Sequence, residues 1–279
     1  MVFSTELLIV LIVAALISGI GWFKFLYFIS VGYGFSVAGC GVTLLVLFTP
    51  ELSLDTVLLC SLLIVYGCRL SGFLLFREIR SASYKKALPG LTKTSRPITV
   101  PFKFIIWVSV FILYVLQISP VFYRLYNISV AGGIQDDSMV KIDSLWAYIG
   151  ACIMAIAILL ESLADFQKSR AKKKNPGRFC DRGLYKIVRC PNYFGEILFW
   201  TGCFLSGIGA LQNVWQWVIA AVGYVSIVYI MFGGARRLEI RQNKNYGSDP
   251  EYQKYVSKTP ILLPLVPVYH LEHLTFLKG

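Results

Sequence analysis

The stretch LWAYIGACIMAIAILLESL, residues 145–163, decides the fold class of this chain. Its only charged residue is Glu161, and nearly all the others are apolar or small. A bilayer core takes about 20 predominantly apolar residues per helix, so this stretch predicts a membrane-spanning helix. We therefore expect an all-α fold, a polytopic transmembrane helix bundle of about seven spans. The other six apolar stretches lie outward from the first, at residues 5–21, 25–48, 54–76, 102–124, 194–212 and 214–232.

The amino-acid composition agrees with the bilayer as solvent. Of the 279 residues, 56% belong to the set AVILMFWYC and 15% are charged, and the mean hydropathy is +0.65. Soluble domains carry roughly 25% charged and 45–50% apolar residues. The composition excludes a soluble globular protein, a disordered chain and a disulfide-stapled secreted module. The seven cysteines lie mostly inside apolar runs and are interpreted as small packing residues.

The basic residues indicate the orientation of the bundle. The net charge of +12, from 27 basic and 15 acidic residues, would indicate nucleic acid in a soluble protein. Here residues 77–103, residues 165–190 and the tail after 235 together hold 23 of the 27 bases. With seven spans these segments fall on one side, which the positive-inside rule makes the cytoplasm. We expect the N-terminus outside, the C-terminus in the cytoplasm, membrane lipids as partners and no nucleic acid.

Which membrane holds the protein depends on the organism. We expect the endoplasmic reticulum in a eukaryote and the inner membrane in a bacterium.

Residues 259–277 are apolar but broken by Pro260, Pro264 and Pro267, which cannot continue a helix. This tail is expected to lie along the cytoplasmic interface or to tuck back against the bundle. A sequon at Asn127 lies too near a span end for glycosylation to be expected.

Residues 183–196, GLYKIVRCPNYFGE, are the most informative stretch for function. The sixth span begins inside it, so Arg189, Asn192, Tyr193 and Glu196 crowd the cytoplasmic mouth of one helix. The N–H groups and the positive dipole end at such a mouth favour phosphate or carboxylate. Asn192 and Glu196 are four residues apart and share a helix face. The simpler alternative is a capped helix start with a surface ion pair.

A second polar stretch follows the seventh span. It contains Arg236, Arg237 and Glu239, then Tyr246, and then EYQKY at residues 251–255. Such a stretch can anchor the protein to anionic lipid headgroups. It can equally close one wall over a phosphorylated cofactor, because arginine binds phosphate bidentately and tyrosine offers a stacking face and a hydroxyl.

Residues 183–196, with Glu239 and residues 246–264, resemble the C-terminal domain of the steroid 5-alpha-reductases and of the related membrane proteins known as DUF1295. Residues 66–70 and 161–168 also resemble DUF1295 segments. The resemblance implies NADPH-dependent reduction of a carbon–carbon double bond conjugated to a ketone, in a steroid or another lipid-soluble small molecule. Cys190 departs from the Arg-His-Pro-Asn-Tyr pattern usual in DUF1295.

The resemblance also implies an organisation and a cofactor site. Residues 1–126 would line a substrate chamber, and residues 144–279 would bind the cofactor and carry the cytoplasmic loops and tail. The enzyme would polarise the substrate carbonyl with a hydrogen-bond donor while NADPH supplies hydride. The positions that resemble the family's NADPH-binding set are Asp165, Lys168, Lys172, Arg189, Asn192, Tyr193, Glu196, Arg237, Glu239, Tyr246 and Tyr252.

Steroid reductases place an acid and a tyrosine in their early spans to act on the carbonyl. In this chain the early spans are expected to lack a carboxylate in the apolar interior, because Asp55 lies near the outer end and Glu78 near the inner end. Tyr66 and Arg69 are the catalytic candidates that remain, with Tyr33 as a further phenol. Arg69 lies about two turns inside the third span and is expected to face the bundle interior, unless it snorkels or forms a salt bridge.

Two other functions stay open. Isoprenylcysteine and phospholipid methyltransferases have a similar helix start and tail, and bind S-adenosylmethionine in much the same place. Asn192 directly after Pro191, residues 161–168 and the many bases suited to a 2′-phosphate favour NADPH. The second alternative is a non-catalytic lipid-binding protein, which would not need Asn, Tyr and Glu clustered at one helix mouth. His270 and His273 are interpreted as an interfacial pair and not as a metal site, because a third ligand is missing.

Overall fold

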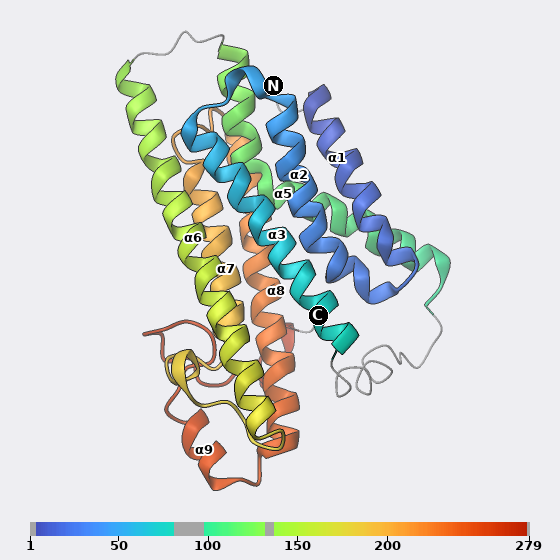
Figure 1. The fold of residues 1–279 in the computed structure, drawn as a ribbon, viewed down its shortest axis with the longest axis vertical. Coiled ribbons are helices and arrows are strands. Elements are labelled where there is room, and N and C mark those ends of the chain that lie inside the picture. Colours follow the sequence, from blue (N-terminus) through green and yellow to red (C-terminus); the bar gives the residue numbers. More distant parts are fainter. Residues whose placement is uncertain (1–3, 81–97, 132–136, 278–279) are drawn as a thin grey trace. The chain divides into compact units, whose positions relative to one another are not determined.

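The computed structural model describes residues 4–80, 98–131 and 137–277. Within these ranges the chain forms helices joined by turns and loops, with no β-strand (Figure 1). The predicted all-α class is therefore confirmed.

The described helices follow one another along the chain. The first half contains α1 (Thr5–Ser18), η1 (Gly19–Trp22), η2 (Phe25–Ile29), α2 (Val31–Leu47), η3 (Thr49–Glu51), α3 (Leu54–Arg80) and α5 (Val100–Ala131), where η denotes a 3-10 helix. The second half contains α6 (Asp137–Lys174), η4 (Gly183–Lys186), α7 (Pro191–Ser206), α8 (Val214–Tyr246), α9 (Pro250–Val256) and η5 (Thr275–Leu277).

Each of the seven predicted spans overlaps one α-helix. Two helices run well beyond the predicted apolar stretches, because α6 continues to Lys174 and α8 to Tyr246. Apolar content marks where a helix can meet lipid, whereas helical hydrogen bonding continues into charged residues that remain good helix formers. These extensions carry most of the residues of the candidate site.

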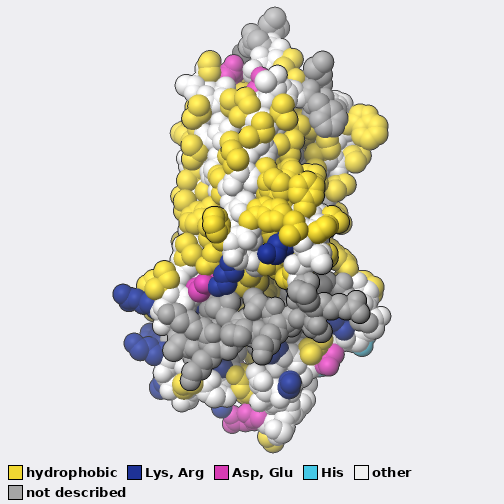
Figure 2. All heavy atoms as spheres, turned by 90° about the vertical axis from the view of Figure 1, so that its right-hand side faces the viewer, with side chains coloured by type: hydrophobic (Ala, Val, Ile, Leu, Met, Phe, Trp, Pro, Cys, Tyr) yellow, Lys and Arg dark blue, Asp and Glu magenta, His cyan; other side chains and the backbone are white. Residues whose placement is uncertain are grey.

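Five of the described helices are long and apolar enough to cross a membrane, while α2 has 17 residues and α7 has 16. Large apolar side chains, among them Leu16, Val46 and Leu159, are exposed on the helices. Figure 2 shows hydrophobic side chains spread over much of the face that it draws. Long helices with apolar outer surfaces make this a multi-pass membrane protein. The five are Thr5–Trp22, Leu54–Arg80, Val100–Ala131, Ser144–Lys174 and Val214–Tyr246.

The chain divides into two compact units. Unit 1 comprises Met1–Ala151 and Cys203–Gly223, and unit 2 comprises Cys152–Gly202 and Tyr224–Gly279. This division follows packing, and α6, α7 and α8 each contribute to both units. The predicted domains, residues 1–126 and 144–279, instead follow chain order.

In unit 1, α2 packs against α3 through small residues. A Cβ added at Gly67 of α3 would collide with the carbonyl oxygen of Gly34 and come within 2.7 Å of the Ala38 nitrogen. A Cβ at Gly41 would lie 3.0 Å from the carbonyl oxygen of Cys60. Such close backbone approach gives the van der Waals contact on which helix association in lipid depends, since lipid tails are as apolar as the side chains.

Two buried polar contacts connect α5 to other parts of unit 1. Arg124 Nη1 donates to Asp55 Oδ2 over 3.0 Å, and its Nε donates to the carbonyl oxygen of Ser206 over 3.1 Å. Asn127 and Gln216 exchange amide hydrogen bonds of 2.9 and 3.0 Å, which ties up the amide of the sequon. Asp55 lies in the first turn of α3, at the end of the span as expected, and is 4% exposed because the guanidinium of Arg124 compensates its burial.

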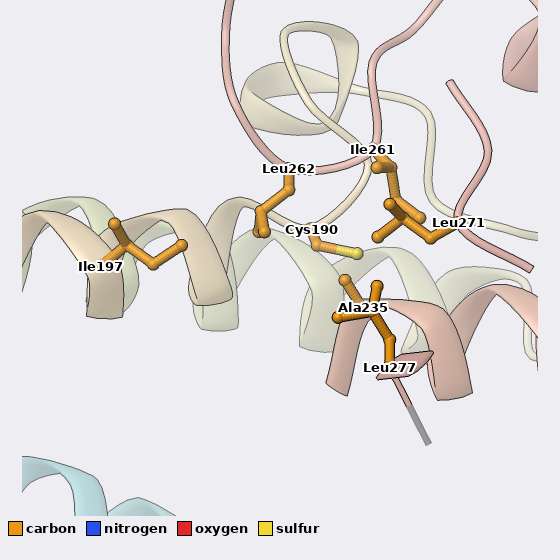
Figure 3. Packing of buried hydrophobic residues seen from close by; sticks show 7 residues of the cluster. All are labelled: Cys190, Ile197, Ala235, Ile261, Leu262, Leu271 and Leu277. Carbon is orange, nitrogen blue, oxygen red and sulfur yellow. The ribbon is translucent and has the colours of Figure 1, made fainter. Parts of the chain in front are cut away.

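Figure 3 shows an apolar core of unit 2 formed by the start of α7, by α8 and by the C-terminal tail. The backbone N–H of Cys190 donates to the carbonyl oxygen of Ile261 over 2.9 Å, which fixes the tail beside the start of α7. The tail therefore tucks back against the helices, which is one of the two predicted arrangements. The core residues are Cys190, Ile197, Ala235, Ile261, Leu262, Leu271 and Leu277.

Candidate functional site

All eleven residues predicted to bind the cofactor belong to unit 2. They lie on the last turns of α6, on the connection between η4 and α7, on the first turns of α7, on the last turns of α8 and on α9. Their contacts divide them into a group around the first turn of α7, a buried ion pair and an aromatic cluster.

The first turn of α7 presents backbone donors. Pro191 begins the helix, where its missing N–H costs nothing. The first hydrogen bond of the helix is donated by Phe194 N to the carbonyl oxygen of Cys190, over 3.1 Å. The N–H groups of Asn192 and Tyr193 precede that bond, so they lie at the helix end that favours an anion.

A polar contact to α6 holds this turn in place. Asn192 Nδ2 donates to Asp165 Oδ1, and Tyr185 Oη donates to Asn192 Oδ1 over 2.8 Å. Burial raises the pKa of Tyr185, and the neighbouring Cys180 and Asp165 raise it further. The Tyr185 phenol is therefore protonated at neutral pH and orients the Asn192 amide as a donor.

Two buried carboxylates lie on the neighbouring turns. Glu196 of α7 is 7% exposed, and Glu161 of α6 is 2% exposed. Gly195 lets the two helices meet here, because a Cβ at this position would collide with the Glu161 side chain. Acidic groups so deep in a polar helix end can accept hydrogen bonds from hydroxyl or amide groups of a ligand.

Tyr193 lies against α8. A Cβ at Gly234 would come within 3.3 Å of the Tyr193 ring, so this glycine makes room for it. Burial raises the pKa of the Tyr193 phenol, and the positive charges of Arg237 and Arg241 act in the opposite direction. The charges of two guanidinium groups of α8 thus act on the Tyr193 phenol, and the sequence had predicted only Arg237 as a ligand.

Arg189 and Glu239 form a buried ion pair. Their side chains are 1% and 0% exposed, and Arg189 Nη2 lies 3.0 Å from Glu239 Oε1. Glu239 Oε2 accepts the backbone N–H of Leu271 over 2.7 Å and that of Glu272 over 3.0 Å. Arg189 Nη2 also donates to the carbonyl oxygen of Tyr269. Both predicted ligands are thus engaged in holding the tail, which is a structural role.

Lys172 and Tyr246 are likewise engaged with each other. Lys172 Nζ donates to Tyr246 Oη and to the carbonyl oxygen of Arg178, each over 2.6 Å. Tyr246 packs with Phe179 and Tyr252 in a cluster of aromatic rings. Burial raises the pKa of the Tyr252 phenol to about 12. This cluster closes the polar end of unit 2.

Cys190 is the residue at which the sequence departs from the expected Arg-His-Pro-Asn-Tyr pattern. Its side chain lies in the apolar core of Figure 3, and burial raises the pKa of its thiol to about 11, although the charge of Lys168 acts to lower it. A buried neutral thiol packs as a small hydrophobe. Cys190 therefore makes an apolar contact where the expected pattern would place a hydrogen-bonding ring.

The sequence missed three residues that shape this end of unit 2, namely Tyr185, Gln167 and Gly183. Gly183 has a φ of +62°, and a Cβ on it would collide with the Gln167 amide. Gln167 Oε1 accepts the backbone N–H of Leu184 over 2.9 Å, which fixes the start of η4. The sequence signal for this turn was Gly183 itself, because glycine adopts a positive φ at no steric cost.

The catalytic candidates Tyr66 and Arg69 belong to unit 1. Tyr66 is fully buried, and its Oη lies 3.3 Å from Tyr33 Oη. Tyr33 in turn packs against the ring of Tyr114 of α5, with a centroid distance of 4.9 Å. Arg69 is half-buried, with its guanidinium 5.9 Å from the centre of the Phe73 ring. Three tyrosines from α2, α3 and α5 therefore meet inside unit 1.

The two histidines have different surroundings. His270 Nδ1 lies 3.0 Å from Glu239 Oε1, and His273 is exposed. Among residues 4–80, 98–131 and 137–277, no three His, Cys, Asp or Glu side chains come together in a way that could hold a metal ion.

The fold and these groups define a class of multi-pass helical membrane protein with a polar, arginine-bearing helix mouth in its C-terminal unit. Over residues 21–259 the sequence matches the family described as protein of unknown function (DUF1295). The chain belongs to this family. Neither the curated proteins nor the solved structures contain a match to the chain.

Proposed function

We propose that this protein is an NADPH-dependent membrane reductase, which reduces a carbon–carbon double bond conjugated to a carbonyl group in a steroid-like or other lipid. The observation that carries the proposal is the first turn of α7, where Asn192 and Tyr193 lie with Asp165 and two arginines of α8. This place offers N–H donors and guanidinium groups together with carboxylate acceptors. A dinucleotide with an extra 2′-phosphate needs donors for its phosphate groups and acceptors for its hydroxyl groups.

The residues around α7 fit the cofactor by their chemistry. The N–H groups of Asn192 and Tyr193, with Arg237 and Arg241, would bind phosphate oxygens. The carboxylate of Asp165 would accept hydrogen bonds from ribose hydroxyl groups or from the nicotinamide carboxamide. When bound, NADPH supplies the hydride. The protein's part is to bind, to orient and to keep water out.

The substrate would lie among the membrane helices of unit 1. Tyr66 is the proposed donor to the substrate carbonyl, where its O–H would stabilise the enolate that forms as hydride reaches the β-carbon. Full burial of Tyr66 supports this role, because a hydrogen bond is stronger where water is excluded. Arg69 is the second candidate for contact with the substrate.

We further propose seven spans, with the N-terminus outside and the C-terminus in the cytoplasm. The bundle would then need α2 and α7 as short spans beside the five longer helices. Distribution of the bases supports the orientation, since 23 of 27 lie in segments that seven spans place on one side. The protein would then reside in the endoplasmic reticulum membrane of a eukaryote or in the inner membrane of a bacterium.

Ligand-induced stabilisation tests the cofactor. The purified protein in detergent should show a higher melting temperature with NADPH than with NADH or S-adenosylmethionine, because a ligand that binds the native state shifts unfolding. Arg241→Ala should weaken NADPH binding about tenfold, through loss of one charge-assisted phosphate contact of about 1.5 kcal/mol. Glu196→Ala should abolish the shift while the protein keeps its helical content.

The matched control is Lys254→Ala, which removes an exposed base from α9 and should leave the NADPH shift unchanged. Equal melting temperatures with and without NADPH would refute the reductase. A shift with S-adenosylmethionine alone would instead establish the methyltransferase alternative. A shift by NADPH that survives in Glu196→Ala would move the cofactor site away from α7.

A further inference from the structure

Gln117 carries a buried side-chain amide inside a membrane-spanning helix. The reaction proposed above gives this amide no role. It lies on α5 and is 3% exposed. Within the part of the chain that the structure describes, neither its Nε2 nor its Oε1 has a hydrogen-bond partner. Buried side-chain amides are normally paired, and an unpaired one in an apolar protein interior is costly. The position therefore needs a physical explanation.

The backbone around Gln117 is adapted to close packing. Pro120 has no N–H, so the carbonyl oxygen of Leu116 lacks its usual helical donor and accepts the hydroxyl of Ser119 over 2.7 Å. A Cβ at Gly223 would come within 2.9 Å of Gln117 N. Cys203 Sγ lies 3.5 Å from the carbonyl oxygen of Gln117. These contacts engage the backbone of this turn, whereas no described residue forms a hydrogen bond with the side-chain amide.

Gln117 also lies close, along α5, to the three tyrosines of unit 1. Tyr114 is three residues before it, which places both on one face of the helix. Tyr114 packs on Tyr33, and Tyr33 Oη lies 3.3 Å from Tyr66 Oη. The interior of unit 1 thus contains an amide and three phenols, of which the Tyr114 hydroxyl donates to the carbonyl oxygen of Phe28.

The chemistry of the amide limits what it can bind. Its buried neighbours Ile118 and Val121 on α5 are apolar, and Arg124, seven residues further along, is already paired with Asp55. A charged ligand group would therefore lose its hydration without gaining a free counter-charge. A neutral carbonyl oxygen can accept the Nε2–H and still has a second lone pair for a phenol. A hydrocarbon ligand has no acceptor and would leave the amide unpaired.

We propose that Gln117 is the polar end of a binding site for the lipid substrate inside unit 1, and that its Nε2–H donates to the substrate's carbonyl oxygen. The inference rests on the proposed reductase function, because that reaction requires a lipid with a carbonyl group. It proposes a second donor in unit 1 besides Tyr66 and makes Gln117 a determinant of specificity. Carbonyl-bearing lipids are selected over their hydrocarbon analogues.

Pairs of probes that differ only in the carbonyl group test the site. The full-length protein in detergent, without NADPH, is titrated with cholest-4-en-3-one and with cholest-4-ene, and separately with a linear long-chain enone and the matching alkene. The melting temperature should rise more with the ketone than with the hydrocarbon in at least one pair. In Gln117→Met, which keeps the volume and removes the amide, that difference should vanish.

The ligand-free melting temperature gives an independent readout. Gln117→Met should leave it unchanged or raise it, because the variant removes an unpaired buried amide. Gln216→Met is the matched control, since Gln216 is a buried glutamine whose amide is paired with Asn127. It should lower the ligand-free melting temperature and retain the preference for the ketone. If the control does not fold, the exposed substitution Ser109→Ala on α5 replaces it.

Two results would overturn the inference. One is an equal response to ketone and hydrocarbon in both probe pairs, and the other is a ketone preference that persists in Gln117→Met. Failure of the reductase proposal is recognised separately, because these titrations contain no NADPH. A ketone preference that depends on Gln117, together with no NADPH shift, would establish the lipid site and refute the reductase.

Discussion

Glu239 is the residue on which the C-terminal tail depends. Its carboxylate has a positive guanidinium on one side and two backbone N–H groups of the tail on the other. The sequence marked both Arg189 and Glu239 as cofactor ligands, because charged residues near a helix mouth look alike whether they face a ligand or each other. Burial separates the two possibilities, and burial depends on the fold of residues 259–277.

We predict that Glu239→Gln lowers the free energy of unfolding by about 3–5 kcal/mol. The variant keeps an acceptor for the tail but leaves the Arg189 guanidinium buried without its counter-charge. Unfolding in mixed micelles, followed by circular dichroism, measures the change. Glu251→Gln is the control, because it breaks an exposed ion pair to Arg178 and should cost less than about 1 kcal/mol. Equal losses in both variants would contradict the assigned role.

The residues around α7 show which site features a sequence can reveal. Asn192 and Asp165 were predicted and do meet, because both lie in short motifs next to span ends. Tyr185 and Arg241 were missed, since Tyr185 lies in the short 3-10 helix η4 that Gly183 begins and Arg241 is one base among several on α8. Their proximity depends on tertiary packing that no local pattern records.

At the scale of elements, the contact between α2 and α3 depends on glycine. Both Gly34 and Gly67 lie where the two backbones meet, and no side chain fits there. Apolar content alone predicted where these two helices lie along the chain. It did not show which faces meet, because small residues are also common at positions that face lipid.

We predict that Gly67→Ala destabilises the protein by about 1–3 kcal/mol, because the added methyl group would force α2 and α3 apart. Gly72→Ala on the same helix is the control. A Cβ at Gly72 meets nothing within 4 Å, so this variant should be neutral or gain up to about 1 kcal/mol from higher helix propensity. Thermal unfolding in one detergent compares the two. The packing described for α2 and α3 would be refuted if Gly67→Ala melted no lower than Gly72→Ala.

At the scale of the whole molecule, the fold class was accessible from the sequence because the solvent imposes it. A chain with 15% charged residues and repeated apolar stretches must satisfy its backbone inside helices in a bilayer. The division into two units was not accessible, since it divides α6, α7 and α8 between them. Apolar stretches give the order of helices along the chain, whereas the compact units depend on contacts between residues far apart in it.

Reporter fusions test the orientation and the number of spans together. Green fluorescent protein fused after residue 279 should fluoresce, and alkaline phosphatase at the same place should be inactive, because the C-terminus is predicted in the cytoplasm. Truncation after Asn213 removes α8, so both reporters should give the opposite result there. Seven spans place those two positions on opposite sides, since one crossing separates them. Reporters that agree at residues 213 and 279 would mean that α8 does not cross, and an active phosphatase at 279 would mean that the 23 clustered bases do not mark the cytoplasmic side.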